Sequence, residues 1–151
     1  MPKAIPDGYH TVTPYLSCAD AAKAIAFYKE ALGATELYRL PMPNGKVGHA
    51  ELQIGDSRVM LADESPEWGN KSAKTLGGSP IGLAIYTENV DALAERFVKA
   101  GGKVVRALEN QFYGDRSGQF QDPEGFKWTL GQHIEDVSPE EMQRRMAKMG
   151  G

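Results

Sequence analysis

The sequence predicts an α+β fold in which one β-α-β-β-β unit occurs twice. A strand-like run over 11–17 leads into a helix-like run that ends at Gly33, and three strand-like runs follow. The same order begins again at 81–87 and contains a second helix-like run, which ends at Gly101-Gly102. The two helix ends read alike, Phe-Tyr-Lys-Glu-Ala-Leu-Gly in the first half and Phe-Val-Lys-Ala-Gly-Gly in the second. Each unit is expected to cover one sheet face with its helix and to leave a concave face bare, so that two units enclose a cavity.

The length of 151 residues fits one domain, 1–151, with a substantial core. Within it we expect the first repeat over about 9–63 and the second over about 80–132. The stretch between them, about 64–79, is rich in Gly, Pro, Ser and Asn. A long stretch of this kind is typical of a linker or of a functional loop. Trp68 within it favours a functional role.

Capping residues mark the ends of the predicted helices. Asp20 is the expected N-cap of the first helix and Gly33 its left-handed stop. Asn89 or Asp91 caps the second helix. A C-terminal helix over about 138–148 begins at a Ser-Pro-Glu-Glu capping box with proline at the first helical position. This helix lies outside both repeats and is expected to pack on an edge or on a partner subunit.

Three turn signals separate the strand-like runs. Asn44-Gly45 indicates a two-residue hairpin, and Gly55-Asp56 indicates a second one. The run Asp-Pro-Glu-Gly over 122–125 predicts a tight turn before the last strand, because proline fixes φ and glycine accepts a positive φ.

The composition is that of a globular protein and excludes several classes of function. Charged residues make up 25% of the chain and apolar residues 41%, as in ordinary domains. A net charge of −3 offers no basic stripe, so no nucleic-acid partner is expected. The single cysteine, Cys18, cannot form an internal disulfide, and no apolar run reaches the ~20 residues of a bilayer span. The N-terminus also lacks the apolar centre of a secretory signal. We therefore expect a cytoplasmic protein without a membrane partner.

Alternation along the strands predicts which side chains face the cavity. The apolar members, such as Leu52, Leu83 and Trp128, must meet the helices, where each fully buried aliphatic side chain contributes about 1.5–3 kcal/mol. Ile81 is assigned to the same buried set. The opposite members are expected on the concave side: Thr13, Tyr15, His49, Glu51, Gln53, Arg58, Met60, Ala84, Tyr86, Ser117, Gln119, Lys127 and Thr129. This lining suits a small polar or aromatic ligand, but antiparallel sheets also leave such faces simply in water.

The order of the elements resembles the vicinal oxygen chelate superfamily, which includes glyoxalase I, extradiol dioxygenases, fosfomycin-resistance enzymes and bleomycin-resistance proteins. The resemblance rests on Phe27-Tyr28 near the end of the first helix, on Leu-Gly at its stop and on the Asp-Pro-x-Gly turn, and it covers nearly the whole chain. The segments 113–118, 122–125 and 133–141 are similar to the PhnB-like branch. The resemblance implies that two chains pair as a homodimer.

In that superfamily, His, Gln or Glu side chains from the first and fourth strands of each half hold a divalent metal. Carried over to this sequence, the four positions are Thr13, Met60, Gly82 and Thr129. None of these is such a ligand, and a slip of one or two residues along the strands brings in no His, Glu, Asp or Cys. We therefore expect no metal and no cofactor, and metal-dependent glyoxalase, dioxygenase or fosfomycin-transferase chemistry is not predicted.

His49 and Glu51 are the best candidates for catalysis, because they lie two residues apart on one strand and face the same side. An imidazole beside a carboxylate can act as an acid/base pair, but a hydrogen-bonded lining residue is the simpler interpretation of His49. The adjacent residues Asp115 and Arg116 are predicted to form an internal ion pair. The alternative is that Arg116 holds an anionic ligand. Cys18 has no basic neighbour and is predicted to be unreactive.

The ligand contacts are expected from the concave side and from the linker, where four aromatic side chains can stack on a planar ligand. The full predicted set is Tyr15, His49, Glu51, Trp68, Tyr86, Tyr113, Gln119 and Lys127. We therefore predict a protein that binds a small polar or aromatic molecule, for sequestration or resistance. The alternatives are a lyase or isomerase that uses His49 and Glu51, and a domain kept only for subunit association, so that the sequence leaves enzymatic activity open.

Overall fold

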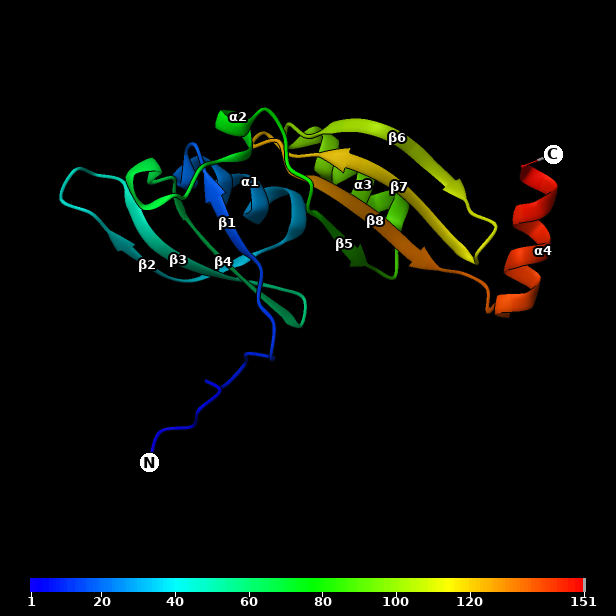
Figure 1. The fold of residues 1–151 in the computed structure, drawn as a ribbon, viewed down its shortest axis with the longest axis horizontal. Coiled ribbons are helices and arrows are strands. Elements are labelled where there is room, and N and C mark those ends of the chain that lie inside the picture. Colours follow the sequence, from blue (N-terminus) through cyan, green and yellow to red (C-terminus); the bar gives the residue numbers. More distant parts are fainter. Residues whose placement is uncertain (151) are drawn as a thin grey trace.

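The computed structural model describes residues 1–150 and contains two modules of the same design (Figure 1). Module 1 consists of β1 (Tyr15–Cys18), α1 (Ala21–Leu32), β2 (Thr35–Pro41), β3 (Val47–Ile54) and β4 (Ser57–Asp63). Module 2 consists of β5 (Gly82–Tyr86), α3 (Val90–Lys99), β6 (Lys103–Asn110), β7 (Asp115–Gln121) and β8 (Lys127–His133). The short helices η1 (Pro66–Trp68) and α2 (Ala73–Leu76) occupy the stretch between the modules, and α4 (Pro139–Met149) follows module 2.

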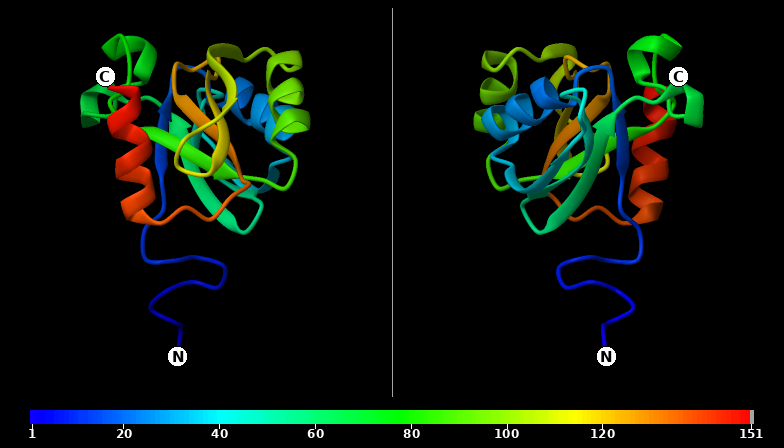
Figure 2. Two further views of the ribbon diagram at one scale, coloured as in Figure 1. Left: turned by 90° about the vertical axis from the view of Figure 1, so that its right-hand side faces the viewer. Right: turned by 90° about the vertical axis from the view of Figure 1, so that its left-hand side faces the viewer.

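Each module forms a four-stranded sheet, with strand order β1-β4-β3-β2 in the first and β5-β8-β7-β6 in the second. The first and last strands of each module pair in parallel, and the other neighbours are antiparallel. The helices α1 and α3 lie on one side of the two sheets and pack against one another (Figure 2). The predicted α+β fold of two β-α-β-β-β repeats with a C-terminal helix is confirmed. We call the uncovered surfaces the bare faces of sheet 1 and sheet 2.

The capping residues set the helix ends largely as predicted. Asp20 accepts a backbone N–H of the first turn of α1 at 3.1 Å, and Gly33 ends the helix with a φ of 66°. The cap of α3 is Asn89, which accepts a first-turn N–H at 3.1 Å. Asp91 instead lies in that first turn and pairs with Arg116 at 2.8 Å.

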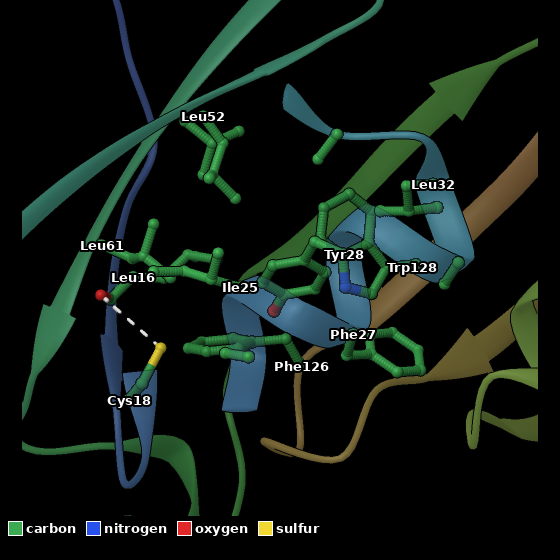
Figure 3. Close-up of a cluster of buried hydrophobic side chains, with 14 of the residues drawn as sticks. Leu16, Cys18, Ile25, Phe27, Tyr28, Leu32, Leu52, Leu61, Phe126 and Trp128 are labelled. Carbon is green, nitrogen blue, oxygen red and sulfur yellow. Dashed lines mark hydrogen bonds between the residues drawn. The ribbon is translucent and has the colours of Figure 1, made fainter. Parts of the chain in front are cut away.

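Aromatic side chains of the core join the two modules (Figure 3). The ring centroid of Tyr28, on α1, lies 5.5 Å from that of Trp128, on β8. The neighbouring Phe27 meets Phe97 of α3 edge-on, with the centroids 5.1 Å apart. The helix of module 1 therefore packs on both the helix and the sheet of module 2.

The turn between β7 and β8 adds hydrogen bonds to this junction. Asp122 is only 3% exposed, and its carboxylate accepts the Tyr28 hydroxyl at 2.5 Å and the Trp128 indole N–H at 2.9 Å. Glu124 accepts the backbone N–H groups of Ala19 and Asp20 at 2.7 and 3.0 Å. The turn that the sequence predicts as a local bend thus satisfies donors at the start of a helix in the other module.

One residue of the predicted core is exposed. Ile81 is 67% exposed, because β5 begins one residue later, at Gly82, which pairs with Lys127. Leu83 and Ile85 are the members of this run that pack against the core. The assignment of Ile81 to the buried set is therefore wrong, since alternation alone does not show where a strand begins.

Helix α4 stands beyond the end of module 2, on the side of the sheets opposite to α1 and α3 (Figures 1 and 2). Its cap is Ser138, whose hydroxyl accepts the N–H of Glu141 at 3.2 Å. Arg145 ties the helix to the body through the carboxylate of Glu135 at 3.0 Å and the carbonyl of Phe112 at 2.9 Å. None of the helices within residues 1–150 combines the length and the apolar character that a bilayer span requires.

Candidate functional site

A chain of hydrogen bonds runs across the bare face of sheet 1. The Tyr15 hydroxyl, at the start of β1, lies 2.7 Å from Nδ1 of His49 on β3. The other ring nitrogen, Nε2, lies 2.8 Å from Oε2 of Glu51. Glu51 faces Met60 of β4, which is in turn the β1 partner of Tyr15, so the strand register brings these side chains together. Three of the predicted ligand-binding residues thus form one cluster.

Two further tyrosines complete the cluster. Tyr38 of β2 donates to Oε2 of Glu51 at 2.7 Å, and Tyr9 of the N-terminal lead-in donates to Oε1. Sequence reasoning missed both. The register of β2 shifts between Glu36 and Tyr38, which breaks the alternation, and Tyr9 lies ahead of the first strand.

The surroundings shift the pKa values of Glu51 and Tyr15 in opposite directions. Burial alone would raise the pKa of Glu51, but hydrogen bonds from His49 and the two tyrosines bring that pKa below its usual value. Burial, and then the charge of Glu51, raises the pKa of Tyr15, so its hydroxyl keeps its proton. An ionised carboxylate can only accept, so in the neutral form of the His49 ring the proton lies on Nε2, and Nδ1 accepts the hydrogen bond that the Tyr15 hydroxyl donates.

In this arrangement few atoms of His49 and Glu51 remain available for proton transfer. Both ring nitrogens of His49 and both oxygens of Glu51 already have partners within the protein. A general base needs an available lone pair within reach of the substrate proton. What the cluster does expose is aromatic surface, since Tyr15 is 51% and Tyr38 46% exposed.

The bare face of sheet 2 carries a comparable cluster around Asp115. The Tyr86 hydroxyl donates to Oδ2 of Asp115 at 2.6 Å, and Nδ1 of His133 lies 2.8 Å from Oδ1. Nε2 of His133 lies 2.8 Å from the carboxylate of Asp136. Hydrogen bonds to Asp115 and then to Asp136 raise the pKa of His133. Each bare face therefore carries a carboxylate that holds both a histidine and a tyrosine.

The other predicted contacts are more scattered. The Tyr113 hydroxyl lies 3.1 Å from Oγ of Ser117, one step along the same face of β7 from Asp115. Gln119 follows on that face, and Lys127 is exposed at the start of β8. Trp68 is 81% exposed on η1 and makes no ring contact with the other aromatic residues of the described chain.

The predicted ion pair between Asp115 and Arg116 is wrong. Consecutive residues of a strand point to opposite faces. Asp115 therefore turns toward Tyr86 and His133, whereas Arg116 reaches Asp91 of α3, with 2.8 Å between Nη2 and Oδ1. Arg116 therefore forms its ion pair with a residue in the first turn of α3.

The resemblance predicts the metal-ligand positions at Thr13, Met60, Gly82 and Thr129, and none of these carries a His, Gln or Glu side chain. Within residues 1–150, no group of three or more His, Cys, Asp or Glu side chains is placed to hold a metal ion. Cys18 is fully buried, and burial followed by nearby carboxylates raises the pKa of its thiol. A protonated, inaccessible thiol is not a nucleophile.

A cavity of about 630 Å³ lies in the seam between the two modules. We call it the seam cavity, and it is lined by His10, Val12, Thr13, Pro14, Leu32, Leu93, Trp128 and the residues of 54–59 and 83–87. Tyr86 is the member of the predicted ligand-binding set found in this lining. The sequence predicted a cavity between the two units, and four residues of its expected lining also line the seam cavity: Thr13, Arg58, Ala84 and Tyr86. Sequence reasoning missed the apolar residues of this lining, because they come from segments of both modules that carry no shared local signal.

The chain is similar to several known proteins. The model of the Glyoxalase/Bleomycin resistance protein/Dioxygenase superfamily matches residues 9–130. The uncharacterized protein Mb0911c of Mycobacterium bovis is 44% identical over 142 residues, which cover 92% of this chain and 93% of that protein. Protein PA1353 from Pseudomonas aeruginosa has a similar structure, with a TM-score of 0.67, 25% identity and coverage of 83% of this chain and 99% of that one. The PhnB protein from Bacillus cereus shares the fold, with a TM-score of 0.63, 16% identity and coverage of 82% and 99%.

Proposed function

Because this chain belongs to the Glyoxalase/Bleomycin resistance protein/Dioxygenase superfamily, we propose that it binds a small polar or aromatic molecule on the bare faces of its sheets, without a metal or another cofactor. The biological form of this function is sequestration of a toxic metabolite or antibiotic in the cytoplasm. The observation that supports it is the pair of clusters in which carboxylates hold exposed tyrosines. The proposed contacts are Tyr15, His49, Glu51, Trp68, Tyr86, Tyr113, Gln119 and Lys127.

Exposed, fixed aromatic rings favour a planar ligand. Tyr15 is 51% and Tyr86 68% exposed, although the hydroxyl of each is hydrogen-bonded on its own sheet. A ring that is already held in place loses less conformational entropy when a ligand stacks on it. The polar atoms around the rings then orient the ligand.

We further propose that two chains pair through the bare faces as a homodimer. Helices α1 and α3 cover only one side of the sheets (Figure 2), and the other side carries exposed side chains such as Tyr15 and Tyr86. Leu40 lies opposite His49 in the β2–β3 register, hence on the bare face of sheet 1, and is 56% exposed. Exposed apolar surface of this kind is typical of an interface, and pairing would enclose a ligand.

Sedimentation velocity tests the pairing. We expect a dimer at micromolar concentration and a shift toward monomer in Leu40→Glu, with Leu76→Glu on α2 as an exposed control. A wild-type protein that sediments as a monomer would contradict this part of the proposal.

A second candidate function is a lyase or isomerase that uses His49 and Glu51. The hydrogen-bond chain from Tyr15 through His49 to Glu51 favours it, because catalytic histidines are commonly held in one tautomer by such a partner. The occupied ring nitrogens disfavour it. His49→Asn separates the two functions, since it should abolish turnover in an enzyme and change only the affinity of a binding protein.

A thermal-shift screen of planar polar compounds tests the binding proposal. A ligand that binds the folded state raises the melting temperature by mass action, and the shift should persist in a chelator such as EDTA. Tyr15→Leu and Tyr86→Leu should reduce the shift, whereas Leu76→Ala should not. A shift that EDTA abolishes, or that survives both tyrosine substitutions, would count against the proposal.

A further inference from the structure

The seam cavity has a chemistry that the two bare-face clusters do not share. We propose that it is a second binding site and that it takes an amphipathic anion, with an apolar or aromatic body in the interior and a carboxylate, phosphate or sulfonate group at Arg58. Its volume of about 630 Å³ lies within the range of small-molecule sites, roughly 300–1,000 Å³. This site goes beyond the function proposed for the bare faces, although it shares Tyr86 with the contacts proposed there.

One wall of the seam cavity is apolar. Leu32 from the end of α1 and Leu93 from α3 line it on the helix side. Leu83 of β5 lies opposite Trp128 of β8, so both side chains share the helix-facing side of sheet 2. The indole N–H of Trp128 is already bonded to Asp122, so the ring offers only carbon surface to the cavity. Such walls favour a hydrocarbon or aromatic body.

Arg58 supplies a fixed positive charge on the cavity wall. Its Nε donates to Oε1 of Gln53 at 2.8 Å, and its guanidinium carbon lies over the Tyr9 ring, 4.8 Å from the centroid. Within residues 1–150 no carboxylate forms an ion pair with Arg58, whereas Arg116 pairs with one carboxylate and Arg145 with two. The guanidinium is therefore held in position while its charge stays uncompensated, which is the arrangement that binds an anionic oxygen well.

The remaining polar residues of the lining do not cancel this charge. The carboxylate of Asp56, at the turn between β3 and β4, accepts the Ser57 hydroxyl at 3.3 Å and forms no ion pair with Arg58. His10 and Thr13 add groups that can hydrogen-bond to a polar head. A single fixed cation beside an apolar wall suits an amphipathic anion better than a sugar or an organic cation.

Two fluorescent probes with the same ring system test this inference. Anilinonaphthalene sulfonate carries a sulfonate, and N-phenylnaphthylamine is the same body without charge. We expect Arg58→Gln to weaken the sulfonate probe about tenfold, as the loss of one charge-assisted contact implies, and to leave the neutral probe within about twofold. Arg58→Lys should retain part of the difference, and Arg106→Gln on β6, outside the cavity lining, should change neither probe.

A bulky side chain that fills the cavity tests whether the two probes bind there. Leu93→Trp should reduce the binding of both probes, while Tyr15→Leu on the bare face should reduce neither. Sulfonate binding that survives Leu93→Trp, or an equal effect of Arg58→Gln on the two probes, would overturn the inference. Should Leu93→Trp fail to fold, displacement from the wild-type protein decides instead: decanoate should displace the sulfonate probe at a lower concentration than decanol, and equal displacement would overturn the inference.

Discussion

The hydroxyl of Tyr28 donates a 2.5 Å hydrogen bond to the carboxylate of Asp122, 94 residues further along the chain. The same carboxylate accepts the indole N–H of Trp128 and the backbone N–H groups of Glu124 and Phe126. Burial raises the pKa of Asp122, although these bonds favour its ionised form. One buried group thus collects donors from both modules, and its loss would leave them without an acceptor.

We therefore expect Asp122→Ala to be among the most destabilising single changes. It should lower the free energy of unfolding by about 3–5 kcal/mol, because several buried donors lose their acceptor, while Tyr28→Phe should lower it by about 1–3 kcal/mol. Asp91→Ala, which breaks the exposed pair with Arg116, should change it by less than about 1 kcal/mol. Urea unfolding at neutral pH measures all three. Equal effects of the buried and exposed substitutions would refute the role given to Asp122.

Glu36 contributes to the way in which the stability of the fold depends on pH. Hydrogen bonds from Arg39 and then Lys29 lower the pKa of Glu36 to about 2, and its side chain is 19% exposed. An acid whose pKa is lower in the folded chain stabilises the fold above its unfolded pKa and loses that contribution as the pH falls. Glu36→Gln should therefore destabilise the protein by about 1–2 kcal/mol at neutral pH, after allowance for solvent screening.

The difference between the wild type and Glu36→Gln should shrink as the pH falls from 4.5 to about 2. Urea unfolding along this pH series provides the measurement, with Glu67→Gln, an exposed carboxylate of η1, as the control. A difference that stays constant across the series would show that Glu36 acts by packing rather than by charge.

The imidazole of His49 provides a direct test of the cluster on sheet 1. Its neutral form should carry the proton on Nε2, because Glu51 only accepts while Tyr15 donates to Nδ1. Nitrogen-detected NMR of the ring distinguishes the two tautomers. Tyr15→Phe removes the donor to Nδ1 and should shift the Nδ1 resonance of His49 while the Nε2 proton stays in place. Observation of the Nδ1 tautomer in the wild type would mean that the direction of the chain is reversed.

The absence of a donor cluster within residues 1–150 leads to a prediction about metals. Elemental analysis of protein dialysed after exposure to Zn, Ni, Mn or Fe should find well below one equivalent of each, and chelator should leave the melting temperature unchanged. A stoichiometric ion that resists dialysis would require ligands that neither the sequence nor the geometry indicates.

Local signals predicted most of the fold. The caps Asp20 and Gly33 and the glycine of the turn at Gly55-Asp56 act on their immediate neighbours, so a few consecutive residues are enough to predict their effect. The two-residue hairpin predicted at Asn44-Gly45 is wrong, because the loop between β2 and β3 runs over 42–46. Alternation along β3 likewise placed His49 and Glu51 on one face. Ile81 shows the limit of this reasoning, because the pattern continues past the residue where strand pairing begins.

Contacts between distant segments explain what could not be predicted. Tyr9 reaches Glu51 across 42 positions, and Glu124 reaches Ala19 across 105. In the sequence, neither Tyr9 nor Glu124 differs in residue type or spacing from an ordinary surface residue. The strand alternation predicted Thr13, Arg58, Ala84 and Tyr86 as lining of a cavity between the units, but the apolar part of the lining depends on how the two modules meet, which no pattern within either module encodes.

The hydrogen bonds that Glu124 accepts from the residues just before α1 have a consequence for biosynthesis. The backbone donors of Ala19 and Asp20, and the hydroxyl of Tyr28, find their acceptors on a segment that the ribosome adds roughly a hundred residues later. The nascent amino-terminal half therefore leaves the exit tunnel with these groups in water, and it reaches its final compact state only after the second half has been translated.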